Sequence, residues 1–226
     1  MKKIKSYAAA SSDSLLKPFD ITRRECSDYD VYINIEYCGV CHSDIHMARN
    51  EWGGSTIYPI VPGHEIIGVV SSVGPMVKKF KAGDDVGVGV YVDSCGHCQN
   101  CKNNLDHYCE KGIVLTYNSY EYGTRTITYG GYSKSIVVNQ DYIVKIPQGM
   151  NKEKSAPLLC AGITTYSPLK NFKIGSNHKV GIAGLGGLGH MGLKFALSFG
   201  ANVTVFSTSE NKREESYSLG AHSFVN

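Results

Sequence analysis

The 226-residue sequence has no long apolar run, and this absence excludes several classes of protein. No stretch approaches the roughly 18 consecutive apolar residues that a membrane-spanning helix needs. The start is basic, with Lys2, Lys3 and Lys5, but the polar residues 11–13 interrupt it before the apolar segment of a secretory signal could form. We therefore expect neither membrane insertion nor secretion, and the cytoplasm is the default location.

Excess charge of one sign is also scarce. Lysine and arginine number 23 against 20 aspartate and glutamate, which gives a formal net charge of +3. That excess is too small to favour nucleic acid or an anionic membrane as a partner. A content of 42% hydrophobic and 19% charged residues is typical of a globular chain with a core. The length allows one large domain or two modest ones.

Residues 1–150 read as a series of short strands. Apolar and polar side chains alternate from Val31 to Tyr37, as in a half-buried strand, with Val31, Ile33, Ile35 and Tyr37 on one side. Similar short runs, separated by turns rich in glycine and proline, occur at 66–73, 86–90, 135–138 and 143–146. This pattern predicts a β-rich first domain.

The pattern of apolar residues changes after Pro147. A short apolar strand at 180–183 leads into a glycine-rich turn, then a helical pattern over 188–199 that stops at Gly200, then a strand at 203–206. Strand, turn, helix and strand form one βαβ unit. A single unit would leave its apolar faces uncovered, so we expect residues 151–226 to be the first part of a larger α/β domain. The third strand should begin only near residue 226.

Four of the eight cysteines lie close together, in the pattern Cys95-x2-Cys98-x2-Cys101-x7-Cys109. Zinc takes four thiolates in a tetrahedron, and two-residue gaps let a tight loop wrap the ion. Disulfides and an iron–sulfur cluster are the alternatives. Because four thiolates leave no open coordination position, the sequence predicts a structural zinc in the loop 93–110.

Three further residues have the chemistry of metal ligands but are scattered along the chain. Cys41 lies in Gly-Val-Cys-His-Ser-Asp, His64 in Pro-Gly-His-Glu, and Cys160 in Leu-Leu-Cys-Ala-Gly. A lone cysteine between leucines is usually a small buried hydrophobe. A lone histidine is usually an ordinary core or surface residue. Spacing alone therefore leaves a second metal site open.

Taken together, these motifs and Gly-Leu-Gly-Gly-Leu-Gly at 184–189 resemble the zinc-containing medium-chain alcohol dehydrogenases. Cys-His-Ser-Asp, the run 160–169 and Gly-His-Met-Gly at 189–192 look most like the cinnamyl alcohol dehydrogenase branch. The resemblance covers the whole chain. It implies a GroES-like β-rich catalytic domain at 1–150 and an incomplete Rossmann domain at 151–226, truncated by about a hundred residues.

The resemblance makes Cys41, His64 and Cys160 the ligands of a catalytic zinc, with the fourth position open to substrate. Glu65 is expected to approach the metal when that fourth ligand exchanges. Asp44 is expected to hold the outer nitrogen of His64 and fix its tautomer, although an ordinary turn residue is the alternative.

Other positions match the family's proton path and cofactor contacts. Ser43 and His46 correspond to a proton relay, His42 to a contact with a cofactor phosphate, and Thr164 to a residue beside the nicotinamide. Cys26 and Cys38 match no ligand position, so we interpret them as plain thiols.

The glycine-rich turn follows a strand and opens a helix, the context that a dinucleotide site requires. There backbone amides at the positive end of the helix bind the pyrophosphate; the residues concerned are Gly184, Gly186, Gly187, Leu188 and Gly189. The next strand lacks the acid that would bind the ribose of NAD, and Ser207 stands in its place. The resemblance assigns the 2′-phosphate of NADP to Ser207, Thr208, Ser209 and Lys212, with Arg213 as a supporting charge. A solvated loop of mixed charge is the alternative.

The resulting hypothesis is a zinc-dependent oxidoreductase that transfers a hydride between NADP(H) and a primary alcohol or aldehyde. Trp52, Tyr58 and Leu115 are expected to line the substrate pocket. The lignin-type members carry tryptophan at the position of Leu115, so we expect a broader reductase of aromatic and medium aliphatic aldehydes. The complete protein is expected to be a homodimer.

Three alternatives stay open from the sequence. A zinc-free quinone reductase of the same superfamily would lack the seven zinc ligands found here. A nucleic-acid-binding zinc module would need a basic stripe, whereas the cysteine loop mixes lysines with acids. Finally, the chain as it stands could be an inactive zinc-binding portion of the enzyme.

Overall fold

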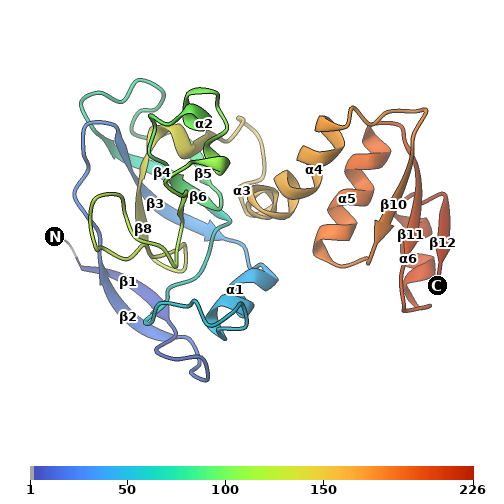
Figure 1. Cartoon of the computed structure of the whole chain (residues 1–226), viewed down its shortest axis with the longest axis horizontal. Coiled ribbons are helices and arrows are strands. Elements are labelled where there is room, and N and C mark those ends of the chain that lie inside the picture. Colours follow the sequence, from blue (N-terminus) through green and yellow to red (C-terminus); the bar gives the residue numbers. More distant parts are fainter. Residues whose placement is uncertain (1–2) are drawn as a thin grey trace. The chain divides into compact units, whose positions relative to one another are not determined.

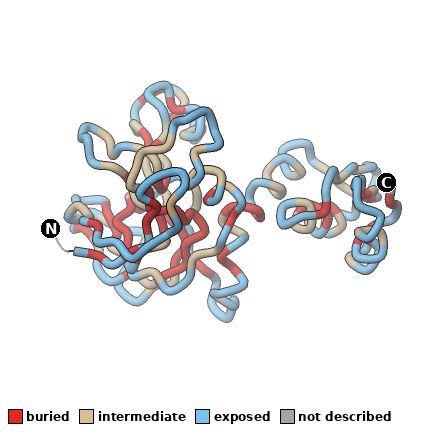
Figure 2. The backbone as a smooth tube through the Cα atoms, turned by 90° about the horizontal axis from the view of Figure 1, so that it is seen from below, coloured by how far each residue is buried: buried red, intermediate tan, exposed pale blue. Residues whose placement is uncertain are grey.

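The computed structural model describes residues 3–226 (Figure 1). The chain divides into two units, of which the first ends at Leu159 and the second is Cys160–Asn226. Each unit has its own hydrophobic core. In the first unit the buried backbone follows the strands of the sheet (Figure 2). Within residues 3–226, no helix has the length and apolar character needed to cross a bilayer.

A five-stranded antiparallel sheet forms the centre of the first unit. Its strand order is β8-β3-β4-β5-β9. The strands are β3 (Asp30–Cys38), β4 (Ile66–Val73), β5 (Asp85–Val88), β8 (Ser135–Asn139) and β9 (Ile143–Lys145). β-Branched side chains dominate its core, as expected of residues that pack well on a pleated surface; they are Val31, Ile33, Ile66, Val70, Val86, Val88, Ile136, Val138 and Ile143. All five strands expected from the sequence are present.

The predicted alternation fails at one end of β3. Val31 and Ile33 are fully buried, but Tyr37 is 43% exposed. The register of β3 against β4 shifts between Tyr32 and Ile33 and again between Ile35 and Tyr37. The second shift leaves Glu36 as an extra residue in β3, so the alternation of side chains breaks just before Tyr37 and a simple period of two mispredicts it. The third predicted strand is also shorter than expected, because β5 ends at Val88.

Several short elements around this sheet were not predicted. The strands are β1 (Lys3–Ala8) and β2 (Lys17–Thr22), which pair antiparallel, and β6 (Tyr91–Asp93) and β7 (Val114–Leu115), which also pair. The helices are α1 (His42–Ala48), α2 (Gln99–Lys102), α3 (Lys152–Ser155), and the 3₁₀ turns η1 (Asp106–Tyr108), η2 (Gln140–Tyr142) and η3 (Ala156–Leu159). The helices and 3₁₀ turns among them are too short for apolar periodicity to reveal them.

The first unit extends further along the chain than the boundary of 150/151 expected from the sequence. Ala156 and Leu159 pack with Ile67 and Ile146 in a small core cluster of the first unit. The glycines of β5 make room for this contact, since a Cβ on Gly87 would lie 2.9 Å from a Leu159 methyl group. The turn η3 therefore belongs to the β-rich unit, although it follows the predicted boundary.

The second unit is a three-stranded parallel sheet with helices. It contains α4 (Ala161–Asn171), β10 (Lys179–Ala183), α5 (Gly187–Ser198), β11 (Asn202–Phe206), α6 (Lys212–Ser218) and β12 (Ser223–Val225). The strand order is β10-β11-β12. The third strand expected only near residue 226 is already present as β12, since residues 223–225 pair in parallel with β11. Gly200 ends α5 with φ +84°, as its predicted C′ position requires.

Candidate metal centres and dinucleotide site

The loop before α1 positions Cys41 through a local capping arrangement. Cys41 is the N-cap of α1, and Asp44, at the third helical position, reaches back to it. The Cys41 backbone N–H donates to Asp44 Oδ2 at 3.0 Å. This reciprocal pairing satisfies amides that a helix start otherwise leaves without partners. The short sequence Cys-His-Ser-Asp thus fixes one thiol and one carboxylate in a single turn.

His64 follows a position, residue 63, that only glycine can occupy. Gly63 has φ +104°, and a Cβ there would lie 2.8 Å from both Cys38 Sγ and a ring carbon of Tyr132. The Gly63 N–H donates to Asp44 Oδ1 at 2.9 Å, and His64 Nδ1 lies 3.0 Å from the same oxygen. Asp44 therefore ties the loop that carries His64 to the helix that follows Cys41.

Cys160 is placed by the end of the first unit. It directly follows Leu159 of η3, whose backbone passes so close to β5 that a Cβ on Gly89 would lie 3.0 Å from the Leu159 carbonyl oxygen. Glycine directly after the end of β5 lets the chain approach the sheet. Because Cys160 is bonded directly to Leu159, the position of Leu159 restricts where the sulfur of Cys160 can lie.

The structure brings the donor atoms of Cys41, His64, Glu65 and Cys160 within 4.8 Å of one another. We call this group the mixed cluster. All four side chains are buried, with exposures of 7%, 3%, 3% and 8%. Nitrogen and sulfur ligands of zinc lie about 2.0–2.3 Å from the ion, so two ligands of one ion are at most about 4.6 Å apart. The donor set and its spread fit a zinc ion with two thiolates and an imidazole.

Asp44 is a buried carboxylate, and its partners keep it ionised. Burial alone would raise its pKa, but hydrogen bonds from His64 and from the backbone outweigh burial and lower the pKa of Asp44 below its usual range. Two phenols lie beside it. Burial, followed by the Asp44 charge, raises the pKa of both Tyr117 and Tyr132. The Tyr117 ring also lies 5.7 Å from the His64 ring.

The two relay residues expected from the sequence lie on α1. Ser43 Oγ is 3.5 Å from Cys41 Sγ. The half-exposed ring of His46 makes tilted contacts with two rings, that of His42 at 4.7 Å and that of Trp52 at 5.3 Å between centroids. Nδ1 of His46 pairs with a Glu51 carboxylate oxygen.

Glu51 is a site residue that the sequence analysis missed. Its contact with His46 depends on the turn that follows α1, where the Glu51 N–H donates to the His46 carbonyl at 2.9 Å. A spacing of five residues matches no regular helical contact, so the sequence offered no signal for it. A carboxylate on Nδ1 orients the ring and leaves Nε2 for proton exchange.

The other expected contacts have simpler surroundings. Thr164 is exposed on α4, and its N–H donates to the Cys160 carbonyl at 3.0 Å. Among the residues proposed for substrate, Trp52 is 49% exposed, and Tyr58 donates its hydroxyl to the Ala48 carbonyl at 2.7 Å. Leu115 lies in β7 opposite Tyr91.

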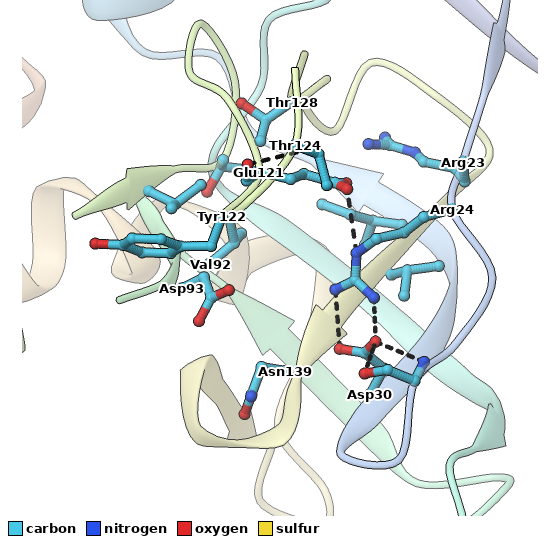
Figure 3. Close-up of a pocket in the computed structure, with 15 residues that line it drawn as sticks. Arg23, Arg24, Asp30, Val92, Asp93, Glu121, Tyr122, Thr124, Thr128 and Asn139 are labelled. Carbon is cyan, nitrogen blue, oxygen red and sulfur yellow. Dashed lines mark hydrogen bonds and ion pairs between the residues drawn. The ribbon is translucent and has the colours of Figure 1, made fainter. Parts of the chain in front are cut away.

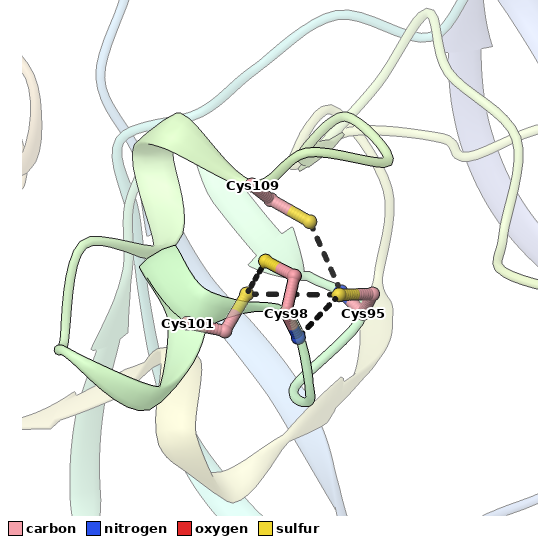
Figure 4. Close-up of side chains that lie close together, drawn as sticks. All are labelled: Cys95, Cys98, Cys101 and Cys109. Atoms are coloured by element: carbon pink, nitrogen blue, oxygen red, sulfur yellow. Dashed lines mark hydrogen bonds between the residues drawn. The ribbon is translucent and has the colours of Figure 1, made fainter.

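The second cluster consists of Cys95, Cys98, Cys101 and Cys109, and we call it the four-cysteine cluster. Their sulfurs point toward one another (Figure 4) and lie within 4.8 Å. Cys98 Sγ and Cys95 Sγ are 3.4 and 3.8 Å from Cys101 Sγ. Sulfurs at about 2.3 Å from one tetrahedral ion would be about 3.8 Å apart, whereas disulfide sulfurs are bonded at about 2.05 Å. None of the four is in a disulfide in the described chain. The geometry fits one zinc ion.

Hydrogen bonds around the four-cysteine cluster stabilise thiolates. Ser94 Oγ lies 3.2 Å from Cys101 Sγ, and the Cys98 N–H donates to Cys95 Sγ at 3.4 Å. The Tyr122 hydroxyl lies 3.5 Å from Cys109 Sγ and, as the first cause, lowers the pKa of Cys109 to about 6. The remaining thiols, Cys26 and Cys38, belong to neither cluster. Burial raises the pKa of Cys38 to about 12, as for an unreactive thiol.

The glycines of the turn 184–189 differ in what they do. Gly184 has φ +84°, and a Cβ on Gly189 would lie 1.9 Å from the Gly184 carbonyl oxygen, so the fold itself requires both. By contrast, a Cβ on Gly186 or Gly187 would meet no protein atom within 4 Å. At these two positions the missing side chain leaves space for a ligand at the start of α5, where Leu188 is also exposed. That is the arrangement a pyrophosphate needs.

The carboxyl end of β11 opens on a hollow of about 380 Å³ in the second unit. Ser207 and Thr208 line it together with Ala183, Gly184, Phe206, Val225 and Asn226. Within the loop, Ser207 Oγ accepts the Ser209 N–H at 3.1 Å. The hollow is therefore bordered by hydroxyl groups and by no carboxylate side chain.

Acids already pair with the cations that follow this loop. Lys212 Nζ is 2.6 Å from Glu215, and Arg213 pairs with Glu210 while its guanidinium lies 4.6 Å from the centre of the Phe224 ring. A phosphate ligand would therefore compete with surface ion pairs, which contribute little on their own.

A separate polar cavity of about 230 Å³ lies in the first unit (Figure 3). Arg24 lies between two acids there, pairing with Asp30 and, at 3.4 Å, with Glu121. Burial, as the first cause, raises the pKa of Glu121 and of Asp93 on the same wall. The opposite charges largely neutralise one another, so the cavity is best understood as an internal ion-pair network.

Residues 27–148 match the family of alcohol dehydrogenase GroES-like domains. The chain belongs to this alcohol dehydrogenase family. An aldehyde reductase of Escherichia coli, YahK, is 52% identical over 225 residues, which cover 99% of this chain and 64% of that protein.

Two solved structures of similar enzymes share the fold. A cinnamyl alcohol dehydrogenase of Sorghum bicolor has a TM-score of 0.96 at 45% identity, over 100% of this chain and 64% of that one. The CAD of Helicobacter pylori, complexed with NADP(H), has a TM-score of 0.93 at 46% identity, over 98% and 64%. The predicted fold class and the resemblance to the cinnamyl alcohol dehydrogenase branch are thereby confirmed. The chain spans less than two thirds of the length of each relative.

Proposed function

We propose that this chain provides both zinc sites and the first part of the NADP(H) site of a zinc-dependent alcohol dehydrogenase that acts as an aldehyde reductase. The observation that carries the proposal is the mixed cluster. Segments around residues 41, 64 and 160 bring two thiols and an imidazole together in a buried position. Zinc accepts two thiolates and an imidazole as ligands.

In the proposed reaction, Cys41, His64 and Cys160 hold a zinc ion, which supplies Lewis-acid polarisation of an alcohol or carbonyl oxygen. Glu65 adds a carboxylate oxygen to the same cluster. Asp44 accepts from Nδ1 of His64, which fixes the tautomer that leaves the other nitrogen for the metal. These residues would hold and orient the centre, and a bound nicotinamide would supply the hydride chemistry.

Proton transfer is assigned to α1. The Ser43 hydroxyl lies next to the Cys41 sulfur and moves the proton of the reacting oxygen. His46 then exchanges the proton with solvent, since its ring is half exposed and Glu51 holds its Nδ1. His42, which stacks on His46, and Thr164 on α4 are proposed as contacts for the cofactor.

The four-cysteine cluster is proposed to bind a second, structural zinc. Four thiolates complete a tetrahedron, so this site has no position for substrate. It would hold the loop 93–110 in its folded form.

NADP(H) is proposed as the cofactor because of the loop after β11. An NAD site would place an acid at Ser207 to bind the ribose diol. Ser207, Thr208 and Ser209 instead offer hydroxyls, and Lys212 offers a cation. The pyrophosphate would bind at Gly184, Gly186, Gly187, Leu188 and Gly189. The similar enzyme of Helicobacter pylori was solved with NADP(H).

The proposed substrates are aromatic and medium aliphatic aldehydes, with Trp52, Tyr58 and Leu115 at the pocket. The similar Escherichia coli protein is named an aldehyde reductase. NADPH is kept reduced in cells, so we expect reduction to be the working direction. The complete protein is proposed to act as a homodimer on small molecules in the cytoplasm, without nucleic acid.

The test combines a zinc count with an NADPH-oxidation assay on a panel of aldehydes, for both the complete protein and this 226-residue chain. We expect two zinc ions per chain and, in the complete protein, turnover that Cys41→Ser or His64→Ala abolishes. Cys26→Ser is the control and should leave turnover unchanged. Turnover that survives both ligand substitutions would refute the zinc mechanism and favour a zinc-free reductase. Zinc binding without turnover by the 226-residue chain would identify it as an inactive portion.

A further inference from the structure

The carboxylate of Asp44 is shared among three separate segments of the first unit. Oδ1 accepts from the Gly63 N–H at 2.9 Å and faces His64 Nδ1 at 3.0 Å. Oδ2 accepts from the Cys41 N–H at 3.0 Å and from the Tyr132 hydroxyl at 3.2 Å. With an exposure of 3%, Asp44 depends on protein donors rather than on bulk water. Tyr132 is its partner from far along the chain.

Backbone hydrogen bonds clamp Tyr132 against the loop that carries His64. The N–H groups of residues 130, 131 and 132 donate to the carbonyls of Val61, Gly63 and Pro62 at 2.7, 2.8 and 2.9 Å. A Cβ on Gly63 would lie 2.8 Å from the Tyr132 ring, so the two segments touch. The phenol therefore has little freedom to leave the carboxylate.

A partly buried arginine, Arg23, holds the same segment through several hydrogen bonds. Arg23 donates to the carbonyls of Tyr129, Gly130 and Ser135 at 2.6, 3.1 and 3.1 Å. It also donates to Ser133 Oγ at 2.9 Å. A guanidinium with several carbonyl acceptors fixes a loop in one conformation because its donors form a rigid fork. The position of Tyr132 is thus determined by two independent sets of contacts.

We propose that Tyr132 is a positioning residue of the mixed cluster, because its hydroxyl holds Asp44 in the orientation that directs Oδ1 at His64. The proposal rests on the proposed function, since it concerns the metal that His64 would bind. Without the hydroxyl, Oδ2 loses one of its two hydrogen bonds described above and keeps that of the Cys41 N–H, so the carboxylate is held less firmly. Groups that orient a metal-binding histidine typically change metal affinity by about 10- to 100-fold. Tyr132 acts through Asp44, so we expect an effect near the lower end of that range.

The experiment compares the 226-residue chain with its Tyr132→Phe variant, both loaded with zinc, in competition with a chromogenic chelator. Tyr132→Phe should release zinc from the mixed cluster about 10-fold faster, while release from the four-cysteine cluster stays unchanged as an internal reference. Tyr32→Phe is the matched control, since it removes a part-buried hydroxyl whose partner is Ser135 Oγ at 2.8 Å. The control should match wild type in zinc release.

A second measurement separates positioning from a loss of stability. In the Co²⁺-loaded chain, Tyr132→Phe should shift the visible ligand-field bands of the mixed cluster, and Tyr32→Phe should not, even where both lower the melting temperature. Unchanged zinc release in Tyr132→Phe, or equal changes in both variants, would overturn the inference. A wild-type chain that binds only one zinc would instead overturn the proposed function, and this inference with it.

Discussion

Removal of the metal from the four-cysteine cluster should unfold the loop 93–110 without unfolding the sheet beneath it. The buried cluster in this loop consists of Cys98, Cys101 and Cys109, with Cys95 packed against it. The larger apolar side chains of the loop face solvent, since Leu105 is 41% and Tyr108 is 65% exposed. The loop therefore has almost no hydrophobic core of its own.

The magnitudes show which interaction dominates. Burial of three thiols contributes about 1 kcal/mol each. Ordering the backbone costs roughly 1–2 kcal/mol for every residue of the loop. A structural zinc ion contributes about 10–16 kcal/mol in small zinc-binding peptides. If the loop binds the proposed zinc, metal binding is the main source of free energy for its folding, and apolar packing is minor.

Hydrogen exchange followed by mass spectrometry measures this directly. Amides such as Lys102 N–H, bonded to the Cys98 carbonyl at 3.0 Å, and Leu105 N–H, bonded to the Asn100 carbonyl at 2.9 Å, should lose protection when a chelator strips the metal. Peptides from β3 and β4 should keep theirs. Cys101→Ser should reproduce the loss, and Cys26→Ser should not. Full protection of residues 93–110 after verified metal release would refute the reasoning.

Asp44→Asn should weaken zinc retention by the mixed cluster about 10- to 100-fold in chelator competition. Each carboxylate oxygen of Asp44 faces two hydrogen-bond donors, so the NH₂ group of asparagine would face two donors at whichever position it takes. The pKa of Asp44 is lowered on folding, so the ionised carboxylate stabilises the folded state above about pH 4. This stabilisation is lost as the pH falls through the folded-state pKa, and Asp44→Asn should therefore make the melting temperature less dependent on acid pH. Gly189→Ala should destabilise the second unit by more than about 3 kcal/mol, since its Cβ would lie 1.9 Å from the Gly184 carbonyl oxygen. Gly187→Ala, whose Cβ meets no protein atom within 4 Å, should have the melting temperature of the wild type but bind NADP(H) more weakly. In the complete enzyme, Ser207→Asp should shift the kcat/KM preference from NADPH toward NADH, because a carboxylate there repels the 2′-phosphate.

Each of these predictions has an outcome that would contradict it. Equal zinc retention in Asp44→Asn and wild type would show that the carboxylate does not support the metal site. Equal melting of the two glycine variants would mean that the turn has room for a methyl group at both positions. An unchanged cofactor preference in Ser207→Asp would place the 2′-phosphate elsewhere.

The sequence predicted the central sheet well because the residues that the fold buries in its strands are valines and isoleucines, which stand out in the sequence as short apolar runs. β4 occupies the predicted residues 66–73, and the helix predicted over 188–199 is α5. The members of the two candidate metal centres were also available from the sequence, the four-cysteine cluster from its spacing and the mixed cluster only through the family resemblance. Spacing could not reveal the second set, because its members meet only after the chain has folded.

What the sequence could not supply depends on contacts between distant segments. Tyr37 is exposed because an extra residue, Glu36, breaks the alternation of β3 just before it, and such an irregularity has no signature in composition. Glu51 and Tyr132 reach the site through a turn and a clamped loop, which periodicity does not describe. The first unit includes η3 because Leu159 packs on β5, a contact that no local pattern announces.

The packing of Leu159 on β5 makes strand register a determinant of metal coordination. Gly87 and Gly89 lie two residues apart, so both point toward η3, while Val86 and Val88 point the other way. A slip of one residue in β5 would place valine side chains beneath Leu159 and push the following thiol out of reach of its partners. Two residues without side chains, distant in sequence from every member of the mixed cluster, therefore decide whether its second sulfur reaches the first.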